Sequence, residues 1–344
     1  MKLGTQLAYS GDYRAAAAQA VEFERAGFDI VWVAEAYGFD AVSLMGYLAA
    51  KTERIEIGSG VLPVYTRTPT LLAQTAAGLD AVSDGRFVLG IGTSGPQVIE
   101  GWHGVPFDKP LARLRETIEI CRKVWRRDGR LTHEGRAYRL PLPPDQGTGL
   151  GKALKIINHP LRPAIPIYVA SLRPKSVEMT AEMADGWLPA FFMPEKAHKV
   201  WGEALAAGKA KRAPELGPLD IVAGGVIGFD ERARNVLDTM GRWMSALYIG
   251  GMGAREKNFY HTVVTEYGFG DEARVIQDLY LSGKKDEAAA RVPADLLERT
   301  NLVGDEGWVK ERIAVYKEAG VRTLSLMPVG DVARIVDKVR EWAA

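Results

Sequence analysis

Short β-rich runs alternate with helical patterns along nearly the whole chain, and this alternation limits the possible folds. Between the expected strands lie helical stretches such as residues 13–27, where a run of alanines ends at Gly27. An alternation of strand and helix indicates a parallel sheet. The expected strands cover residues 2–9, 28–35, 54–61, 86–95, 164–171, 186–192, 220–229 and 322–329.

Eight such repeats predict an α/β fold of the (β/α)8 TIM-barrel type with insertions, because a barrel needs eight strand–helix units. A doubly wound sheet is the alternative, but it favours a Gly-rich fingerprint after its first strand, and this chain has none there. We expect a single domain over residues 1–344 with two excursions, near residues 129–165 and 230–298. The first contains a predicted β-hairpin in "LTHEGRAYRL", and the second is mostly helical.

Composition excludes several classes of partner. The formal net charge is +1, which gives no basic excess for nucleic acid or an anionic membrane surface. A signal peptide and a spanning apolar segment are not evident either. The one cysteine, Cys121, lies in a helical pattern and is expected to be a buried thiol in a reducing compartment. A cytoplasmic location is therefore expected.

Polar and glycine-rich residues gather where the expected strands end, which is where TIM barrels carry their chemistry. "VASLRPKSVEM" also leads into a helix whose N-terminus could hold an anion, with Arg173 and Lys175 adding positive charge. An exposed basic helix start explains the same residues without a ligand, and glycines at strand ends are often plain turn residues. The strand-end residues are Glu35, Ser59, Gly60, Val61, Thr93, Ser94, Gly95, Ser171, Leu172, Arg173 and Pro189.

Four segments together resemble a known family. They are "FDIVWVAEAYGFDAVSLMGYLAAKT", "RIEIGSGVLPVYTRTP", "DAVSDGRFVLGIGTSGPQVIEGWHGVPF" and "PIYVASLRPKSVEMTAEMADGW". In this order the chain resembles a bacterial-luciferase-like oxidoreductase of the coenzyme F420-dependent branch, with members similar to methylenetetrahydromethanopterin reductase. The resemblance implies a luciferase-like TIM barrel and a deazaflavin cofactor, coenzyme F420, with flavin mononucleotide (FMN) as the alternative.

The resemblance also implies a binding site. In this family the third strand ends in a bulge with a non-proline cis peptide behind the cofactor ring, and by resemblance this bulge falls at Gly60-Val61. Arg67 and Arg173 are the expected positive groups nearest the cofactor's phosphate or acidic tail. The implied cofactor-binding residues are Ser59, Gly60, Val61, Arg67, Thr93, Ser94, Gln97, Ala170, Ser171, Leu172 and Arg173.

Two departures from the family pattern bear on which of the family's reactions this chain can catalyse. Some relatives carry an acid–histidine pair after the second strand, and here Glu35 is followed by Ala36. The sugar-phosphate dehydrogenase branch uses a carboxylate after the fourth strand, where this chain has Gly95-Pro96. Glu35 is the candidate catalytic acid, and the candidate substrate-pocket residues are Tyr65, Trp102, His103, Trp187 and Phe191.

Three functions remain open at this stage. The first is an F420-dependent oxidoreductase that transfers a hydride between the deazaflavin and a small organic substrate. The second is an FMN-dependent luciferase-like monooxygenase, and the third is a flavin- or deazaflavin-binding protein without turnover.

The five histidines show no paired spacing, so no metal site is expected. A homodimer or higher homo-oligomer is expected, and one sequence does not identify the substrate.

Overall fold

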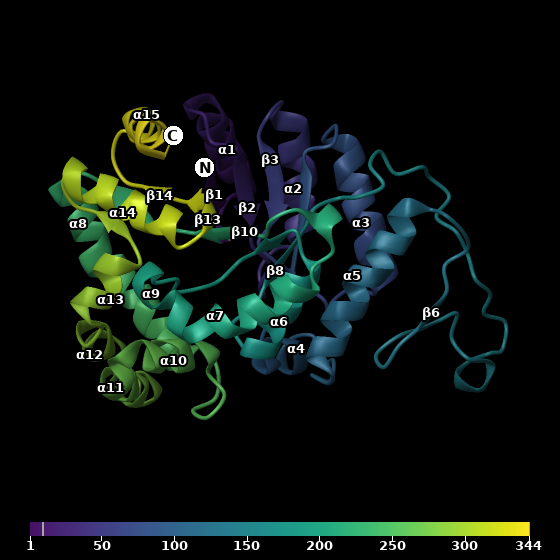
Figure 1. Cartoon of the computed structure of the whole chain (residues 1–344). Coiled ribbons are helices and arrows are strands. Elements are labelled where there is room, and N and C mark those ends of the chain that lie inside the picture. The colour runs from purple at the N-terminus through teal and green to yellow at the C-terminus, as the bar shows by residue number, and fades with distance from the viewer. Residues whose placement is uncertain (9, 344) are drawn as a thin grey trace.

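The barrel is closed. The computed structural model describes residues 1–8 and 10–343; Tyr9, the last residue of the first expected strand, lies outside them. Within these residues eight parallel strands pair in chain order, and the ring closes where the first strand pairs with the eighth (Figure 1). This confirms the TIM barrel and excludes the open doubly wound sheet. The strands are β1 (Lys2–Leu7), β2 (Ile30–Val33), β3 (Glu56–Ser59), β5 (Phe87–Gly92), β8 (Ile167–Ala170), β9 (Gly186–Trp187), β10 (Asp220–Ala223) and β13 (Val321–Ser325).

Helices cover the outside of the barrel. Three of them carry caps at their first turns, where Asp12, Asp40 and Thr68 each accept a backbone N–H bond from their own helix. Gly27 ends the first helix at φ 97°, as the sequence predicted. The outer helices are α1 (Tyr13–Ala26), α2 (Ala41–Lys51), α3 (Pro69–Val82), α5 (Pro110–Arg126), α6 (Pro174–Met183), α7 (Pro194–Lys211), α14 (Glu306–Glu318) and α15 (Val332–Ala343).

Two of the expected strands are each divided in two. The runs at 220–229 and 322–329 leave the barrel after β10 and β13 and continue as β11 (Val226–Gly228) and β14 (Met327–Pro328), which pair with β12 (Leu302–Val303) in a small separate sheet. Two glycines at 224–225, with Gly224 at φ 153°, permit the change of direction between β10 and β11. Similarly, β4 (Leu62–Pro63) continues β3 beyond its bulge.

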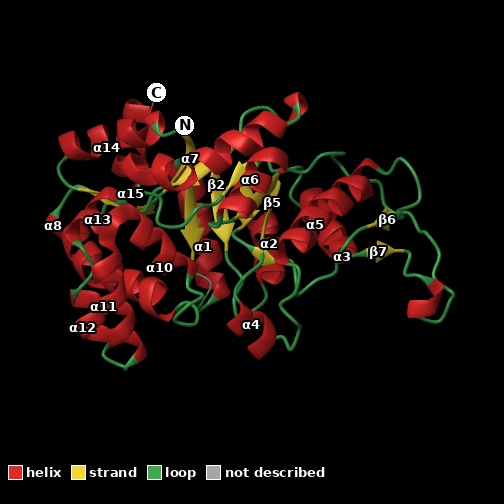
Figure 2. Cartoon of the chain, turned by 60° about the horizontal axis from the view of Figure 1, so that its bottom comes forward, coloured by secondary structure: helices red, strands yellow, loops and turns green. Residues whose placement is uncertain are grey.

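The first excursion is a long arm. It contains the predicted hairpin, formed by β6 (His133–Glu134) and β7 (Arg139–Leu140), and a 3-10 turn at Pro144–Gln146. Figures 1 and 2 both show this segment extending away from the barrel beside α3 and α5.

The second excursion is helical, as predicted, and lies on the other side of the barrel from the arm (Figure 1). Three π-helical segments, Leu237–Gly241, Leu247–Gly251 and Thr265–Phe269, interrupt its α-helices. The α-helices are α8 (Glu231–Val236), α9 (Arg242–Ala246), α10 (Phe259–Val264), α11 (Gly270–Leu281), α12 (Lys285–Ala290) and α13 (Ala294–Arg299).

Candidate functional site

The inside of the barrel has a filled floor. Side chains of parallel strands alternate inward and outward, so every second residue faces the barrel axis. Trp32 and Tyr168 lie against each other with ring centroids 5.3 Å apart. The Tyr168 hydroxyl and the Thr323 hydroxyl donate to one Asp220 carboxylate oxygen, at 2.8 and 2.7 Å. We call the buried cluster of Ile30, Trp32, Val88, Tyr168 and Val222 the floor.

Above the floor the inward positions become small. Toward the carboxyl ends of the strands, the chain places glycine or alanine two or four residues beyond floor residues on four strands, and Gly60 follows β3 in the same way. Gly92 and Ala170 pair directly across β5 and β8. We call this set the mouth layer; it comprises Ala34, Gly60, Gly92, Ala170 and Gly224. Because none of these residues has a side chain beyond Cβ, no long side chain of this layer covers the floor.

The bulge after β3 forms one wall of this space. The Gly60–Val61 peptide is cis, at the position that the resemblance implied. The Gly60 N–H donates to the Val33 carbonyl at 2.8 Å, which ties the bulge to β2. A Cβ atom on Gly92 would lie 3.0 Å from Val61 Cγ2, and one on Gly60 would lie 3.2 Å from Trp32 Cβ. The half-buried Val61 therefore lies over the mouth layer and allows little extra volume beneath it.

Ser59, an expected cofactor ligand, uses its side chain within the barrel. It is fully buried, and its hydroxyl exchanges hydrogen bonds with the Gly90 carbonyl and N–H, both at 2.8 Å. A side chain at Gly90 would overlap the Ser59 carbonyl oxygen. This contact joins β3 to β5 just below the mouth layer, so the Ser59 hydroxyl is already occupied in stabilising the barrel.

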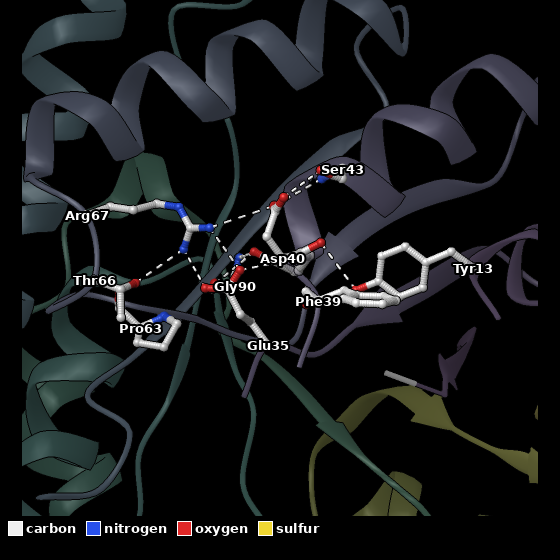
Figure 3. A network of polar contacts seen from close by, with 11 residues as sticks. Tyr13, Glu35, Phe39, Asp40, Ser43, Pro63, Thr66, Arg67 and Gly90 are labelled. Atoms are coloured by element: carbon white, nitrogen blue, oxygen red, sulfur yellow. Dashed lines mark hydrogen bonds and ion pairs between the residues drawn. The ribbon is translucent and has the colours of Figure 1, made fainter. Parts of the chain in front are cut away.

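Glu35 and Arg67 form an ion pair beside the mouth (Figure 3). The two Arg67 amino groups donate to the two Glu35 carboxylate oxygens at 2.5 and 2.8 Å, and the Ala41 N–H donates to the same carboxylate at 3.0 Å. The hydrogen bonds with Glu35 raise the pKa of the Arg67 guanidinium above its ordinary value. Glu35 thus fixes Arg67 and the first residue of α2, and Arg67 already has an anionic partner within the protein.

The loops after β5 and β8 carry the remaining expected ligands. Ser94 has a left-handed backbone, φ 56°, next to the half-buried Thr93. Gln97, in the short helix α4 (Pro96–Gly101), lines a surface depression of about 710 Å³ whose other side includes Lys257 of the second excursion. No local pattern in the sequence connects residue 257 with this loop.

After β8 the chain turns into α6. The Ser171 hydroxyl hydrogen-bonds with the Thr180 hydroxyl. The backbone carbonyl of Ser171 accepts a hydrogen bond from the Trp187 indole at 2.8 Å. The Leu172 carbonyl accepts from Trp201 in the same way. Arg173 remains exposed, with its guanidinium 5.5 Å from the centre of the Phe259 ring, and Lys175, two residues further along, is also exposed. Positive charge therefore collects at the α6 start, as the sequence indicated.

Two expected pocket residues belong to the core instead. Trp187 is completely buried, and its ring meets Trp201 and Phe192 edge-on, because it faces outward from β9 against α7. Tyr65 stacks on Phe107, and burial raises the pKa of its hydroxyl to about 12 while that hydroxyl donates to the Asp108 carbonyl. In this structure both side chains are buried, whereas the sequence predicted them as substrate-pocket walls.

Three expected pocket residues do lie at accessible positions. Trp102 is 66% exposed, with its ring 6.3 Å from that of the exposed Tyr37, and His103 beside it is also exposed. Phe191 is half-buried beyond the end of β9 and contacts Tyr248 and Tyr260 edge-on.

Tyr248 and Tyr260 are candidate pocket residues that sequence reasoning missed. They come from the second excursion, and their rings lie 4.8 Å apart. Nothing in the local sequence places them beside residue 191, because this contact depends on how the excursion folds back. In the part of the chain that the structure describes, no cluster of metal-ligating side chains is found and no helix is long and apolar enough to cross a membrane.

Comparison with known proteins gives consistent matches over the whole chain. A putative coenzyme F420-dependent oxidoreductase of Mycobacterium tuberculosis is 42% identical, covering 98% of this chain and 97% of that protein. The 5,10-methylenetetrahydromethanopterin reductase of Archaeoglobus fulgidus is 29% identical, covering 89% and 87%.

Solved structures share the fold. The coenzyme F420-dependent tetrahydromethanopterin reductase of Methanopyrus kandleri matches with a TM-score of 0.77 at 22% identity, over 98% of this chain and 96% of that one. The sequence profile of one family, the luciferase-like monooxygenases, matches residues 1–323. The chain therefore belongs to the luciferase-like monooxygenase family.

Proposed function

We propose that this protein is a coenzyme F420-dependent oxidoreductase acting on a small organic substrate. The observation that carries the proposal is the mouth layer of glycine and alanine above a packed floor, closed on one side by the bulge at Val61. The whole-chain similarity to a putative F420-dependent oxidoreductase supports the choice of cofactor. When bound, the deazaflavin supplies a carbon that accepts or donates a hydride.

The cofactor fits the residues that are present. A planar ring needs a slot without side chains and a firm back wall, and the mouth layer and Val61 provide both. Enlarging the slot is limited by the floor, because Trp32 lies directly below Gly60. On this proposal Gly60, Val61 and Ala170 hold the ring, and the backbone of Thr93 and Ser94 borders it.

Basic side chains next to the mouth suit the anionic phosphate and acidic tail of such a cofactor. Arg173 and Lys175 lie at the start of α6, where backbone N–H groups also favour an anion. Lys257 borders the depression that Gln97 lines. Arg67 is a weaker candidate for this role than the sequence indicated, because Glu35 neutralises it. We assign the phosphate contact to Arg173.

Glu35 acts as a positioning residue on this proposal. Both of its carboxylate oxygens already accept hydrogen bonds from the protein. A general acid must donate a proton to the reacting group, whereas both Glu35 oxygens are already engaged by Arg67 and by the Ala41 N–H. Glu35 therefore holds Arg67 and the start of α2 at the edge of the site, while Trp102, His103 and Phe191 remain as the accessible residues on the substrate side.

The decisive experiment is a fluorescence titration of the purified protein with coenzyme F420 and, separately, with FMN. We expect F420 to bind at least about tenfold more tightly, a difference of about 1.4 kcal/mol. Tighter binding of FMN would favour the monooxygenase. Tight F420 binding with no reduction or oxidation across a panel of alcohols, aldehydes and unsaturated carbonyl compounds would favour a binding protein without turnover.

A charge reversal locates the phosphate. Arg173→Glu should weaken F420 binding at least about tenfold, and this loss should shrink as salt screens the charges. Arg322→Glu is the matched control, because Arg322 is an exposed arginine near the amino end of β13, at the opposite end of the barrel. Equal affinity of the two variants would remove Arg173 from the site.

We also propose a homodimer that forms through the outer faces of α2 and α3. These adjacent helices carry two charged residues, Lys51 at the end of α2 and the fully buried Asp80 in α3. Surface helices ordinarily expose several charges, so a nearly neutral face with Lys51 as its one exposed charge is typical of an interface. Its exposed residues are Ser43, Tyr47, Ala50, Lys51, Leu71, Gln74, Gly78, Ala81 and Val82.

The assembly is tested by sedimentation. We expect a dimer at micromolar concentration, and Leu71→Glu should convert it to a monomer by burying an unpaired charge. A monomer at every concentration would refute this assembly.

A cytoplasmic location fits the single free and buried thiol of Cys121.

A further inference from the structure

The arm, residues 141–161, exposes an unusual amount of apolar surface. Figures 1 and 2 show it extending away from the barrel beside α3 and α5. Leu150 and Ile157 are 84% and 89% exposed, and Leu142 and Leu154 are at least half exposed. Leu161 is 53% exposed as well. Single exposed apolar residues are common, but five along one short projecting segment indicate a surface that contacts another molecule.

Both ends of the arm are held by the barrel. On the way out, the buried Glu116 of α5 accepts backbone N–H bonds from Arg136, Ala137 and Tyr138, which fixes the hairpin. On the way back, the carbonyl of Leu154 accepts from the Leu131 N–H at 2.7 Å. The arm is therefore a presented element with a defined root.

The returning end of the arm reaches the C-terminal end of α3. Arg162 forms an ion pair with Asp80, the buried carboxylate of that helix. A Cβ atom on Gly85, three residues beyond the end of α3, would lie 3.7 Å from Leu161. The exposed Val82 ends α3 at the same place. The arm thus starts at the edge of the neutral α2–α3 face and extends past it.

The charge of the arm also points to its partner. Residues 129–163, which comprise the arm together with the hairpin and the residues at its root, carry six basic side chains and two acidic ones, in a chain whose formal net charge is +1. The remainder of the chain is therefore net negative. A positively charged arm meets complementary charge on another copy of the same body.

We propose that the arm of each subunit clasps a second copy of this chain, with Leu142, Leu150, Leu154 and Ile157 buried against that copy. Three observations carry this: the apolar exposure of the arm, its continuity with the neutral α2–α3 face, and its charge opposite to that of the body. The inference rests on the dimer proposed above and adds to it an exchange of arms. It does not depend on the cofactor.

Thiol labelling tests the proposal directly. The one native cysteine, Cys121, is fully buried, and burial raises the pKa of its thiol to about 12, so it will not react under mild conditions. Ile157→Cys then introduces one accessible thiol. If the arm clasps a second copy, alkylation of this thiol should be at least about tenfold slower above the dimer dissociation constant than after dilution to monomer. Met240→Cys, an exposed position in the second excursion, is the control and should react at one rate throughout.

A second pair of variants measures the contribution of the arm to assembly. Leu150→Ser with Ile157→Ser should raise the dimer dissociation constant at least about tenfold in sedimentation experiments. Leu281→Ser with Met240→Ser replaces two similarly apolar exposed residues elsewhere and should leave it unchanged. Equal dissociation constants for the two double variants would overturn the proposal.

The outcomes separate the two assembly proposals. A stable dimer whose residue-157 thiol reacts rapidly would overturn the arm exchange and keep the dimer. A monomer at every concentration would overturn both. Protection of the thiol by anionic vesicles or by duplex DNA, but not by raising the protein concentration, would overturn the second copy as the occupant.

Discussion

The floor and the mouth layer are built from the same strands and serve opposite purposes. Along β8, the inward side chain changes from the bulky Tyr168 to Ala170 within two residues. The floor fills its space and pairs its Tyr168 and Thr323 hydroxyls with Asp220, whereas the mouth layer contributes no side chain beyond Cβ. Packed volume supplies stability and open volume supplies binding. Substitutions in the floor should therefore act on unfolding, and substitutions in the mouth layer should act on ligand affinity.

The largest expected effect is on the stability of the floor. Trp32→Ala removes a buried indole and should lower the free energy of unfolding by about 3–5 kcal/mol, because the surrounding barrel cannot collapse into the cavity. Urea unfolding measures this. Trp102→Ala is the control: the same change at an exposed tryptophan by the mouth should stay within about 0.5 kcal/mol. Similar losses of unfolding free energy in Trp32→Ala and Trp102→Ala would show that the floor is not a special source of stability.

The next effect is on the affinity of the mouth. Ala170→Leu adds volume where the cofactor ring is proposed to lie and should weaken F420 binding at least about 100-fold, or about 2.7 kcal/mol. The free energy of unfolding should change by less than about 1 kcal/mol, because Ala170 is only partly buried and the added side chain can turn toward solvent. Fluorescence titration and urea unfolding on the same sample give both numbers. Ala164→Leu, at an exposed position before β8, should change neither. Wild-type affinity in Ala170→Leu would place the cofactor elsewhere.

A smaller effect concerns the ion pairs at the two ends of the barrel. Glu35 and Arg67 at the mouth are 9% and 14% exposed, whereas Lys2 and Glu56 at the other end are 48% and 34% exposed. A double-mutant cycle with alanine at Glu35 and Arg67 should give a coupling energy of about 1–2 kcal/mol. The cycle at Lys2 and Glu56 should give less than about 0.5 kcal/mol, because water screens exposed pairs. Equal coupling energies would show that burial does not strengthen the ion pair between Glu35 and Arg67.

The smallest effect appears at alkaline pH. Burial, reinforced by the neighbouring Asp220, raises the pKa of the Tyr168 hydroxyl above its ordinary value of 10.0. Its stabilising contribution is therefore complete below pH 10 and is lost as the pH rises further, because the unfolded chain releases this proton first. Each such group lowers the free energy of unfolding by at most about 1.4 kcal/mol per pH unit above 10. In Tyr168→Phe, the free energy of unfolding should therefore fall less steeply with pH above 10, by up to about 1.4 kcal/mol per pH unit. An unchanged slope would mean that Tyr168 ionises in the folded protein.

Local sequence predicted a large part of this protein. The eight strands, the end of the first helix at Gly27, the β-hairpin at 131–140 and the buried Cys121 are all confirmed, because each depends on a periodicity, a turn or a neighbour close in the chain. The cis peptide at Gly60–Val61, implied by resemblance, is confirmed as well. The extent of the domain and the roles of the individual site residues stay predictions.

Tertiary structure decided which residues face the site. Trp187 and Tyr65 have the composition of pocket walls, and packing against α7 and Phe107 makes them core. Arg67 acquired its partner 32 positions away, and Phe191 its neighbours from the second excursion. The physical reason is that periodicity along a strand fixes which residues point inward or outward, whereas long-range packing decides what lies opposite each side chain.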